Sequence, residues 1–106
     1  MSQRIRMAAL VLLSASMALP AIAQAPGADT YKAKCAMCHG ADGLAATPMA
    51  KNLKVVSFKD PTMVSATDAQ FIANTTNGKG KMPAYTGKLS DAQIKDVIAY
   101  IRTLQK

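Results

Sequence analysis

The sequence predicts an all-α fold of about four short helices, in which the first and the last helix pack together. Two capping boxes, Thr67–Gln70 and Ser90–Gln93, each start a helix, because their side chains satisfy amide groups that the first turn leaves free. Behind the second box, apolar residues recur three and four positions apart, as on one face of an amphipathic helix. These residues are Ile94, Val97, Ile98, Ile101 and Leu104. No stretch shows the sustained alternation of apolar and polar residues that is typical of a half-buried strand.

Residues 1–23 have the three regions of a secretory signal peptide. Arginines near the start supply positive charge, residues 7–19 are mainly apolar, and Ala21–Ala23 form a cleavage site of small residues. The apolar stretch is shorter than the roughly 20 residues that a membrane-spanning helix needs. We therefore expect residues 1–23 to be removed on export to the periplasm, with no stable membrane insertion afterwards. Residues 24–106 would then form one domain; an uncleaved membrane anchor is the alternative.

The first helix is expected over residues 24–38, with Pro26 in its first turn. It ends in the pattern Cys35-x-x-Cys38-His39, which is an attachment sequence for a covalently bound haem. Positions i, i+3 and i+4 share one face of a helix, so both sulfur atoms and the imidazole point the same way. Each cysteine can form a thioether bond with one haem vinyl group, and His39 can bind the iron as its proximal ligand. A covalent haem would also give this small domain the core that a short chain lacks.

Other uses of the two cysteines fit the sequence less well. A disulfide is common in exported proteins, and a C-x-x-C pair also occurs as a redox dithiol. The βαβ pattern that usually surrounds the redox motif is missing from this sequence. A structural zinc site needs four ligands, but His39 is the only histidine and there are only two cysteines. Haem attachment is the preferred interpretation, with a disulfide or dithiol as the alternative.

Residues 41–60 show no regular pattern, so we expect an irregular segment, with a short edge strand as the alternative. Its apolar residues are expected to line the haem pocket. They are Leu53, Val55, Val56 and Phe58. The carbonyl of Pro48 could accept a hydrogen bond from Nδ1 of His39 and so orient the imidazole ring.

The following helices have clear starts. The pair Asp60–Pro61 combines a capping residue with proline at the first helical position, so a short helix is expected as far as Ser65. The capping box at Thr67 starts a helix that ends at Asn77, before a glycine. Residues 78–87 are then expected to form a flexible, basic loop that leads to the last helix.

This loop carries the best candidate for the second axial ligand of the iron, Met82. The absence of a second histidine excludes bis-histidine ligation and leaves methionine, lysine, tyrosine or water as candidates. Met82 lies far enough after His39 for the chain to pass around the haem, and Pro83 favours an extended backbone before it. A methionine–histidine pair raises the reduction potential of a haem. Met63 and Met49 are the alternatives, and any one methionine could instead pack in the core.

With these parts in place, the chain resembles the class I c-type cytochromes, in particular small periplasmic bacterial ones. The resemblance covers about residues 27–104 and includes the attachment motif, the Met82–Pro83 pair and the last helix. In that family, a glycine and an aromatic residue of the first helix pack against an apolar and an aromatic residue of the last. The matching residues here are Gly27, Tyr31, Val97 and Tyr100. The resemblance implies a cytochrome c fold wrapped around one covalently bound haem c, with His39 and Met82 as iron ligands.

The function that the resemblance implies is single-electron transfer without catalysis. The full chain carries a net charge of +7, and removal of residues 1–23, with two arginines and no acidic residue, leaves +5. Such a charge suits docking to acidic redox proteins or membrane complexes, and we expect Lys79 and Lys81 to contact them near the haem edge. We expect a monomer that does not bind nucleic acid, because the chain is exported and its lysines form no dense run.

Three other functions use the same haem. The chain could be a dedicated cytochrome subunit of a larger dehydrogenase or oxidase complex, which changes the partner but not the chemistry. It could be a ligand sensor, in which a diatomic gas displaces Met82. A peroxidase would need an open iron and a distal acid–base group, for which the sequence offers no second histidine.

Overall fold

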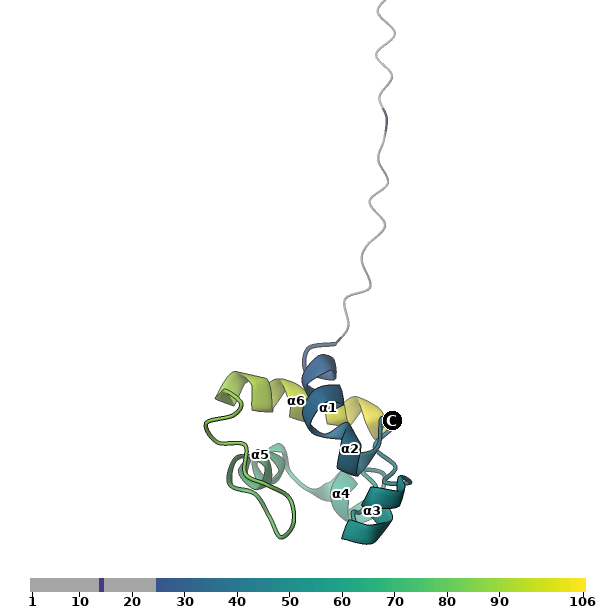
Figure 1. The fold of residues 1–106 in the computed structure, drawn as a ribbon. Helices are drawn as coiled ribbons and strands as arrows, with labels where there is room; N and C mark the ends of the chain where they lie inside the picture. Colours follow the sequence, from purple (N-terminus) through teal and green to yellow (C-terminus); the bar gives the residue numbers. More distant parts are fainter. Residues whose placement is uncertain (1–13, 15–24) are drawn as a thin grey trace, which may run out of the picture.

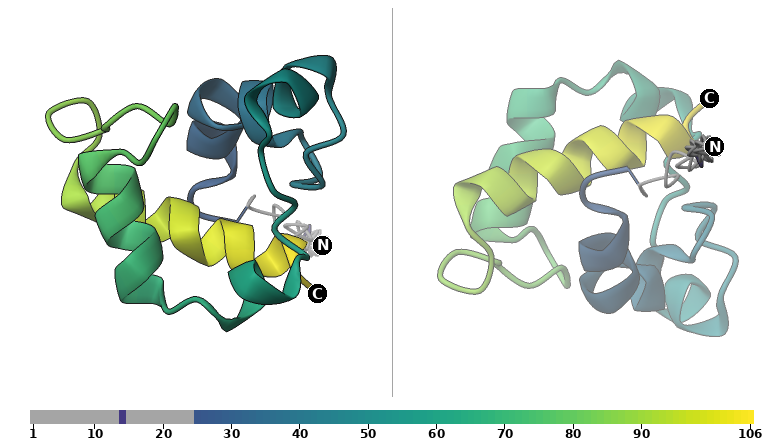
Figure 2. Two further views of the ribbon diagram at one scale, coloured as in Figure 1. Left: turned by 90° about the horizontal axis from the view of Figure 1, so that it is seen from below. Right: turned by 90° about the horizontal axis from the view of Figure 1, so that it is seen from above.

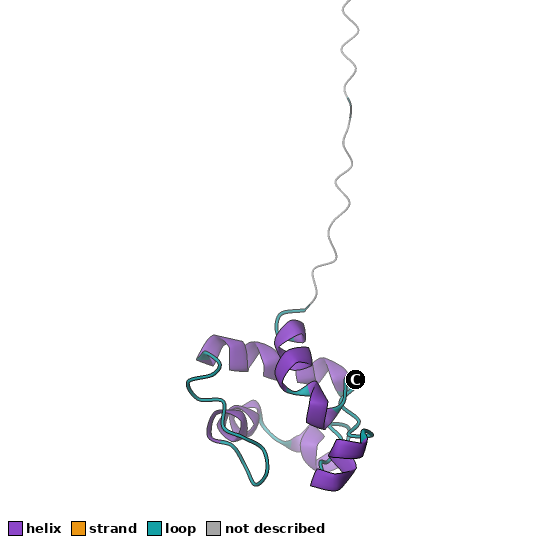
Figure 3. Cartoon of the chain, in the orientation of Figure 1, coloured by secondary structure: helices purple, strands orange, loops and turns teal. Residues whose placement is uncertain are grey.

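The computed structural model describes residue 14 and residues 25–106. The expected signal peptide, residues 1–23, lies outside the described residues apart from residue 14, so its boundary stays a prediction. Between residues 25 and 106 the regular elements are helices, and no strand is formed (Figure 3). They are α1 (Ala28–Lys34), α2 (Ala36–His39), α3 (Pro48–Leu53), α4 (Pro61–Ser65), α5 (Asp68–Asn77) and α6 (Asp91–Leu104). The all-α prediction is confirmed, and none of these helices is long and apolar enough to cross a membrane.

The N-terminal helix differs from the single helix expected over residues 24–38. Gly27 has a φ of +89°, which a right-handed helix does not allow, so α1 begins only at Ala28. Pro26 lies in the turn before the helix and not in its first turn. At Cys35 the backbone leaves the ideal helical conformation, with φ −116° and ψ −36°, and α2 starts at the next residue. The break therefore falls at the first cysteine of the attachment motif.

Helices α1 and α6 pack against each other, as predicted for the first and last helices. Seen from above, α6 crosses α1 (Figure 2). At the crossing, a Cβ atom on Gly27 would lie 2.8 Å from the backbone nitrogen of Val97, so only glycine allows this approach. The rings of Tyr31 and Tyr100 pack beside it with centroids 5.2 Å apart. The four residues named from the resemblance thus meet at one helix crossing.

The largest fully buried side chains belong to the same two helices. Tyr31 from α1 has no exposed surface, and its hydroxyl donates a hydrogen bond to the carbonyl of Gly40, 2.6 Å away. Three residues of α6 are almost completely buried; they are Ile94, Val97 and Ile98. They belong to the apolar stripe that the sequence predicts for the last helix. Burial of such a stripe is what stabilises a helix of this length in a small protein.

Helix α3 corrects the expectation of an irregular segment over residues 41–60. Thr47 caps its start, because its hydroxyl oxygen accepts a hydrogen bond from the amide of Ala50 at 3.0 Å. Pro48 occupies the first helical position, where its missing amide hydrogen costs nothing. The helix ends at Lys54, which has a left-handed φ of +56°. The remainder of the segment is irregular, as predicted, and contains no strand.

The three later helices begin where the sequence predicts. Asp60 caps α4 through Oδ1, which accepts a hydrogen bond from the amide of Thr62 at 3.0 Å. Thr67 and Ser90 form complete capping boxes at the starts of α5 and α6. Helix α6 contacts both α1 and α5, and α2 contacts α3 (Figure 1). The contacts therefore form an open series from α3 through α2, α1 and α6 to α5, in which α6 joins the N-terminal half to α5.

Candidate haem-binding site

A cavity of about 410 Å³ opens among the helices, within the usual range for a cofactor site. The apolar residues of its wall come from α3, from the irregular segment that follows it, and from the later helices. They include Leu53, Val55, Val56, Phe58, Phe71, Val97 and Ile101. The first four are the residues expected to line a haem pocket, so that prediction is confirmed. A wall of this kind suits an apolar macrocycle, because burying apolar surface is favourable.

Cys35, Cys38 and His39 all contribute to the wall of this cavity. After the break at Cys35 the backbone is helical again, since the amide of His39 donates to the carbonyl of Cys35 at 3.0 Å. The two cysteines form no disulfide. Burial, and to a smaller degree the neighbouring Cys38, raises the pKa of Cys35 to about 11. The two thiols and the imidazole thus share one cavity, as haem attachment requires.

The His39 ring is held in place by stacking on Phe58. The two ring centroids are 4.6 Å apart and the planes are inclined by 17°. Phe58 is itself anchored, because its amide donates a hydrogen bond to the carbonyl of Gly43 at 2.9 Å. Burial lowers the pKa of His39, which favours the neutral imidazole that binds metals.

The expected hydrogen bond between His39 Nδ1 and the carbonyl of Pro48 is not formed, so that expectation was wrong. Pro48 is the first residue of α3, and a helical backbone directs its carbonyl along the helix axis. Nδ1 of His39 is instead buried without a hydrogen-bond partner. Native proteins rarely leave a buried polar atom unpaired outside functional sites. This atom therefore marks the imidazole as a residue of the site and not of the packed core.

The three candidate methionines differ in their positions. Met82 and Met63 line the cavity, whereas Met49 does not. Met49 lies in α3 with 42% of its surface exposed, and its sulfur is 3.8 Å from Sγ of Cys38. Of the three candidates, Met82 and Met63 are therefore the two that line this cavity.

The segment that carries Met82 is a loop, as expected from the sequence, and it contains a hydrogen-bonded turn. Lys79 and Met82 exchange backbone hydrogen bonds of 3.1 and 3.0 Å. Gly78 permits the tight turn, because a Cβ atom there would lie 2.8 Å from the carbonyl oxygen of Met82. The amide of Tyr85 then bonds the carbonyl of Thr75 in α5 at 3.0 Å. These contacts fix the backbone of Met82 on both sides.

The charged residues on the cavity wall are all lysines. They are Lys34, Lys54, Lys79 and Lys81. All four are exposed, so they form a cationic rim around an apolar interior. Lys79 and Lys81, the expected docking residues, thus lie at the cavity. No cluster of three or more histidine, cysteine, aspartate and glutamate side chains in the described part of the chain could hold a bare metal ion.

Two residues of the site were not found by sequence reasoning. Tyr85 lines the cavity and donates a hydrogen bond to the backbone of α1, and its place three residues after Met82 was the available signal. Arg102 lies beside the apolar stripe of α6 and binds the backbone at the end of α4. No local pattern in the sequence signals this contact.

These features define the class of protein: a small helical domain built around a covalently attached haem. Thiols and an imidazole share its cavity with a thioether, and the remaining wall is mainly apolar. A family model described as "Cytochrome C oxidase, cbb3-type, subunit III" matches residues 23–101. The chain belongs to this family of c-type cytochromes. Its cofactor is covalently bound haem c, and it is an electron carrier and not an enzyme.

Similar proteins agree with this assignment. Cytochrome c6 of Nostoc sp. is 38% identical over 94 residues, which cover 87% of this chain and 82% of the relative. Cytochrome c6 of Leptolyngbya boryana is 39% identical over 80 residues, covering 73% of this chain and 87% of the relative. The solved structure of the KustC0563 c-type cytochrome superposes with a TM-score of 0.70 and 26% identity. The alignment covers 76% of this chain and 98% of that one.

Proposed function

We propose that the mature chain is a periplasmic single-electron carrier in which His39 and Met82 bind the haem iron. Cys35 and Cys38 would attach the haem through thioether bonds. The observation that carries the proposal is that these four residues, from two separate segments, line the same cavity. The similarity to two cytochromes c6 supports electron transfer as the role.

The haem supplies a reversible one-electron change at its iron. The chain's own residues would keep both axial ligands in place in both oxidation states. Phe58 restrains the ring of His39 by stacking, and the hydrogen bonds between Lys79 and Met82 restrain the methionine backbone. Ligands held by supporting contacts need little rearrangement when the charge on the iron changes. A closed, rigid ligand set is what distinguishes this proposal from a gas sensor or a peroxidase.

The ligand assignment is tested by replacing the two methionines of the cavity one at a time. Met82→Ala should abolish the iron–thioether absorption band, lower the reduction potential and let imidazole bind the ferric iron. Met63→Ala is the matched control and should keep the band. If Met63→Ala loses the band and Met82→Ala keeps it, Met63 is the ligand. If both variants keep the band, neither methionine binds the iron. Haem content, measured on the exported protein, verifies that each variant carries the cofactor.

The partners in this proposal are redox proteins or membrane complexes with an acidic docking surface. Lys79 and Lys81 are exposed and line the cavity that would hold the haem. Opposite charges on two partners accelerate encounter and fix orientation, and this effect weakens as salt is added. Export, monomeric state and the docking role of these two lysines are parts of the proposal.

A second candidate, a dedicated subunit of an enzyme complex, is favoured by one comparison. The cytochrome c subunit of the quinone alcohol dehydrogenase of Gluconacetobacter polyoxogenes is 36% identical over 88 residues. The alignment covers 76% of this chain but only 19% of that subunit. The two candidates differ in their partners, so purification of the native protein separates them. A free carrier elutes alone, whereas a subunit elutes with a dehydrogenase or oxidase.

A further inference from the structure

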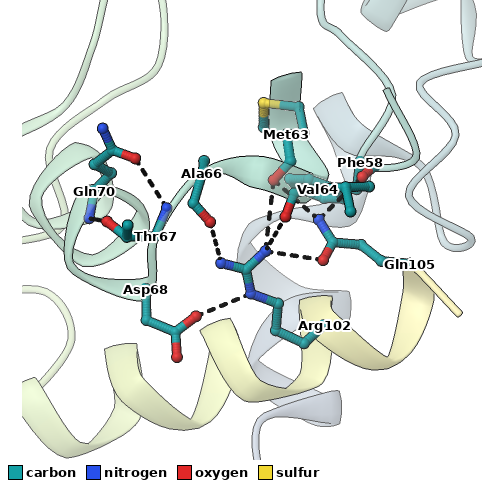
Figure 4. Close-up of polar contacts among 9 residues, drawn as sticks. All are labelled: Phe58, Met63, Val64, Ala66, Thr67, Asp68, Gln70, Arg102 and Gln105. Atoms are coloured by element: carbon teal, nitrogen blue, oxygen red, sulfur yellow. Dashed lines mark hydrogen bonds and ion pairs between the residues drawn. The ribbon is translucent and has the colours of Figure 1, made fainter. Parts of the chain in front are cut away.

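Arg102 makes more polar contacts than any other side chain in Figure 4. Its Nε lies 2.9 Å from Oδ1 of Asp68, at the start of α5. Nη2 donates to the carbonyl of Ala66, and Nη1 lies 3.5 Å from the carbonyls of Met63 and Val64. All three carbonyls belong to the end of α4, where a helix leaves its last carbonyl groups without internal partners. One guanidinium thus binds the end of α4 and the start of α5 together.

The same side chain contacts the cavity wall through its flat face. The guanidinium carbon of Arg102 lies 4.6 Å from the centroid of the Phe71 ring, within the range of a cation–π contact. Phe71 lines the cavity from α5, and Met63 lines it from α4. Arg102 therefore contacts two wall residues, the ring of Phe71 and the backbone carbonyl of Met63. The side chain is itself 26% exposed, so the contacts are only partly open to solvent.

Gln105, the residue that follows the end of α6, reinforces this arrangement. Its side-chain oxygen accepts a hydrogen bond from Nη1 of Arg102 at 3.0 Å. Its amide nitrogen lies 3.0 Å from the carbonyl of Phe58 and 3.4 Å from that of Met63. Phe58 is the residue that stacks on His39. We call Arg102, Gln105 and Asp68 the Arg102 cluster; it joins α6 to segments that carry wall residues on both sides of α4.

We propose that Arg102 is a positioning residue for the haem site, which fixes the α4–α5 wall of the cavity against the terminal helix. Without the guanidinium, the end of α4 and the start of α5 lose their shared partner. The wall then separates from α6 more often, and the turn that follows α5 and carries Met82 moves with it. The effect on ligand exchange rests on the proposed ligation by Met82, whereas the effect on the wall itself does not.

The geometry requires arginine. A guanidinium has five N–H donors in a rigid plane, so it can bind a carboxylate, several carbonyls and an aromatic face at once. A lysine ammonium is a compact charge with three donors and has no flat face to stack on Phe71. Arg102→Lys should therefore keep part of the contact to Asp68 and lose most of the others. An effect midway between wild type and Arg102→Gln is expected for the lysine variant.

The test uses the holoprotein and compares Arg102→Gln and Arg102→Lys with Leu104→Ala. Leu104 lies on the same helix, packs near Gly43 and has no polar side-chain atom to bond α4 or α5, so its truncation is a control for general loss of stability. Asp68→Asn provides a milder variant of the cluster if Arg102→Gln does not fold. The readouts are hydrogen exchange of backbone amides in residues 61–77 and the affinity of the ferric iron for imidazole.

Arg102→Gln should accelerate exchange in residues 61–77 by at least about tenfold, which corresponds to about 1.4 kcal/mol of lost local stability. It should raise imidazole affinity by a similar factor. Leu104→Ala, compared under conditions of equal overall stability, should leave both the exchange rates and the imidazole affinity within about twofold of wild type. Equal effects of the two substitutions would overturn the proposal. If wild type shows no iron–thioether band, the ligation proposal fails, and hydrogen exchange alone then decides the role of Arg102.

Discussion

The hydroxyl of Tyr85 donates a hydrogen bond to the backbone carbonyl of Lys34, 2.9 Å away. Lys34 is the last residue of α1 and directly precedes Cys35, while Tyr85 follows Met82 by three residues. The bond therefore joins the attachment segment to the segment of the proposed methionine ligand. It also satisfies a carbonyl at a helix end, where no internal partner exists.

Tyr85→Phe removes this hydrogen bond and keeps the ring. One hydrogen bond contributes about 1 kcal/mol, so we expect the Met82 segment to open roughly five times more often. The ferric protein should then bind imidazole about fivefold more tightly. The control is Tyr31→Phe, whose lost hydroxyl bonds Gly40 at 2.6 Å inside the core. It should lower the free energy of unfolding without this selective gain in affinity, and a reversal of the two phenotypes would contradict the prediction.

The same bond predicts a dependence on alkaline pH. Burial, followed by Cys35 and Cys38, raises the pKa of Tyr85 in the folded protein. A raised folded pKa means that the contribution to stability is complete below the unfolded pKa of about 10. It is lost as the pH rises through the folded pKa. The difference in unfolding free energy between wild type and Tyr85→Phe should be constant from neutral pH to about pH 9 and should shrink above pH 10. An equally large difference at all pH values would disprove this.

Features that depend on neighbouring residues in the sequence could be predicted. The starts of α4, α5 and α6 follow from Asp60, Thr67 and Ser90, because a capping side chain bonds amides two or three residues away. The apolar spacing behind Ser90 likewise identifies the buried face of α6. The attachment motif is equally local, since its three functional groups lie within five residues.

The contact between the terminal helices was expected, but other features that depend on distant residues could not be predicted. The left-handed backbone of Gly27, where α6 passes close by, sets the true start of α1. Arg102 binds carbonyls of α4 whose positions only the folded chain defines. The start of α3 is a different case. Thr47 and Pro48 are a local start signal, but the small residues around them suggested an irregular loop, so the helix was not predicted.

Gly27→Ala tests the contact between the terminal helices. A non-glycine residue in the left-handed region costs about 1–2 kcal/mol, and here the new methyl group would also meet the backbone of Asp96 and Val97. The control is Gly87→Ala, because Gly87 has a φ of +75° with nothing near its Cβ position. Chemical denaturation should show a clearly larger loss for Gly27→Ala. Equal losses would mean that only backbone strain matters and that the helices tolerate separation.

The docking role of the cationic rim is tested by reversing the charge of Lys79 and Lys81. Both line the cavity, whereas Lys95 and Lys106 do not, so Lys95→Glu with Lys106→Glu gives a control of equal net charge. Rim reversal should slow oxidation by anionic ferricyanide about tenfold at low salt and accelerate oxidation by a cationic cobalt complex. The control pair should change both rates much less. At 1 M salt, where the Debye length is about 3 Å, all variants should converge. Equal effects of the two pairs at low salt would show that only net charge matters and that the rim has no directing role.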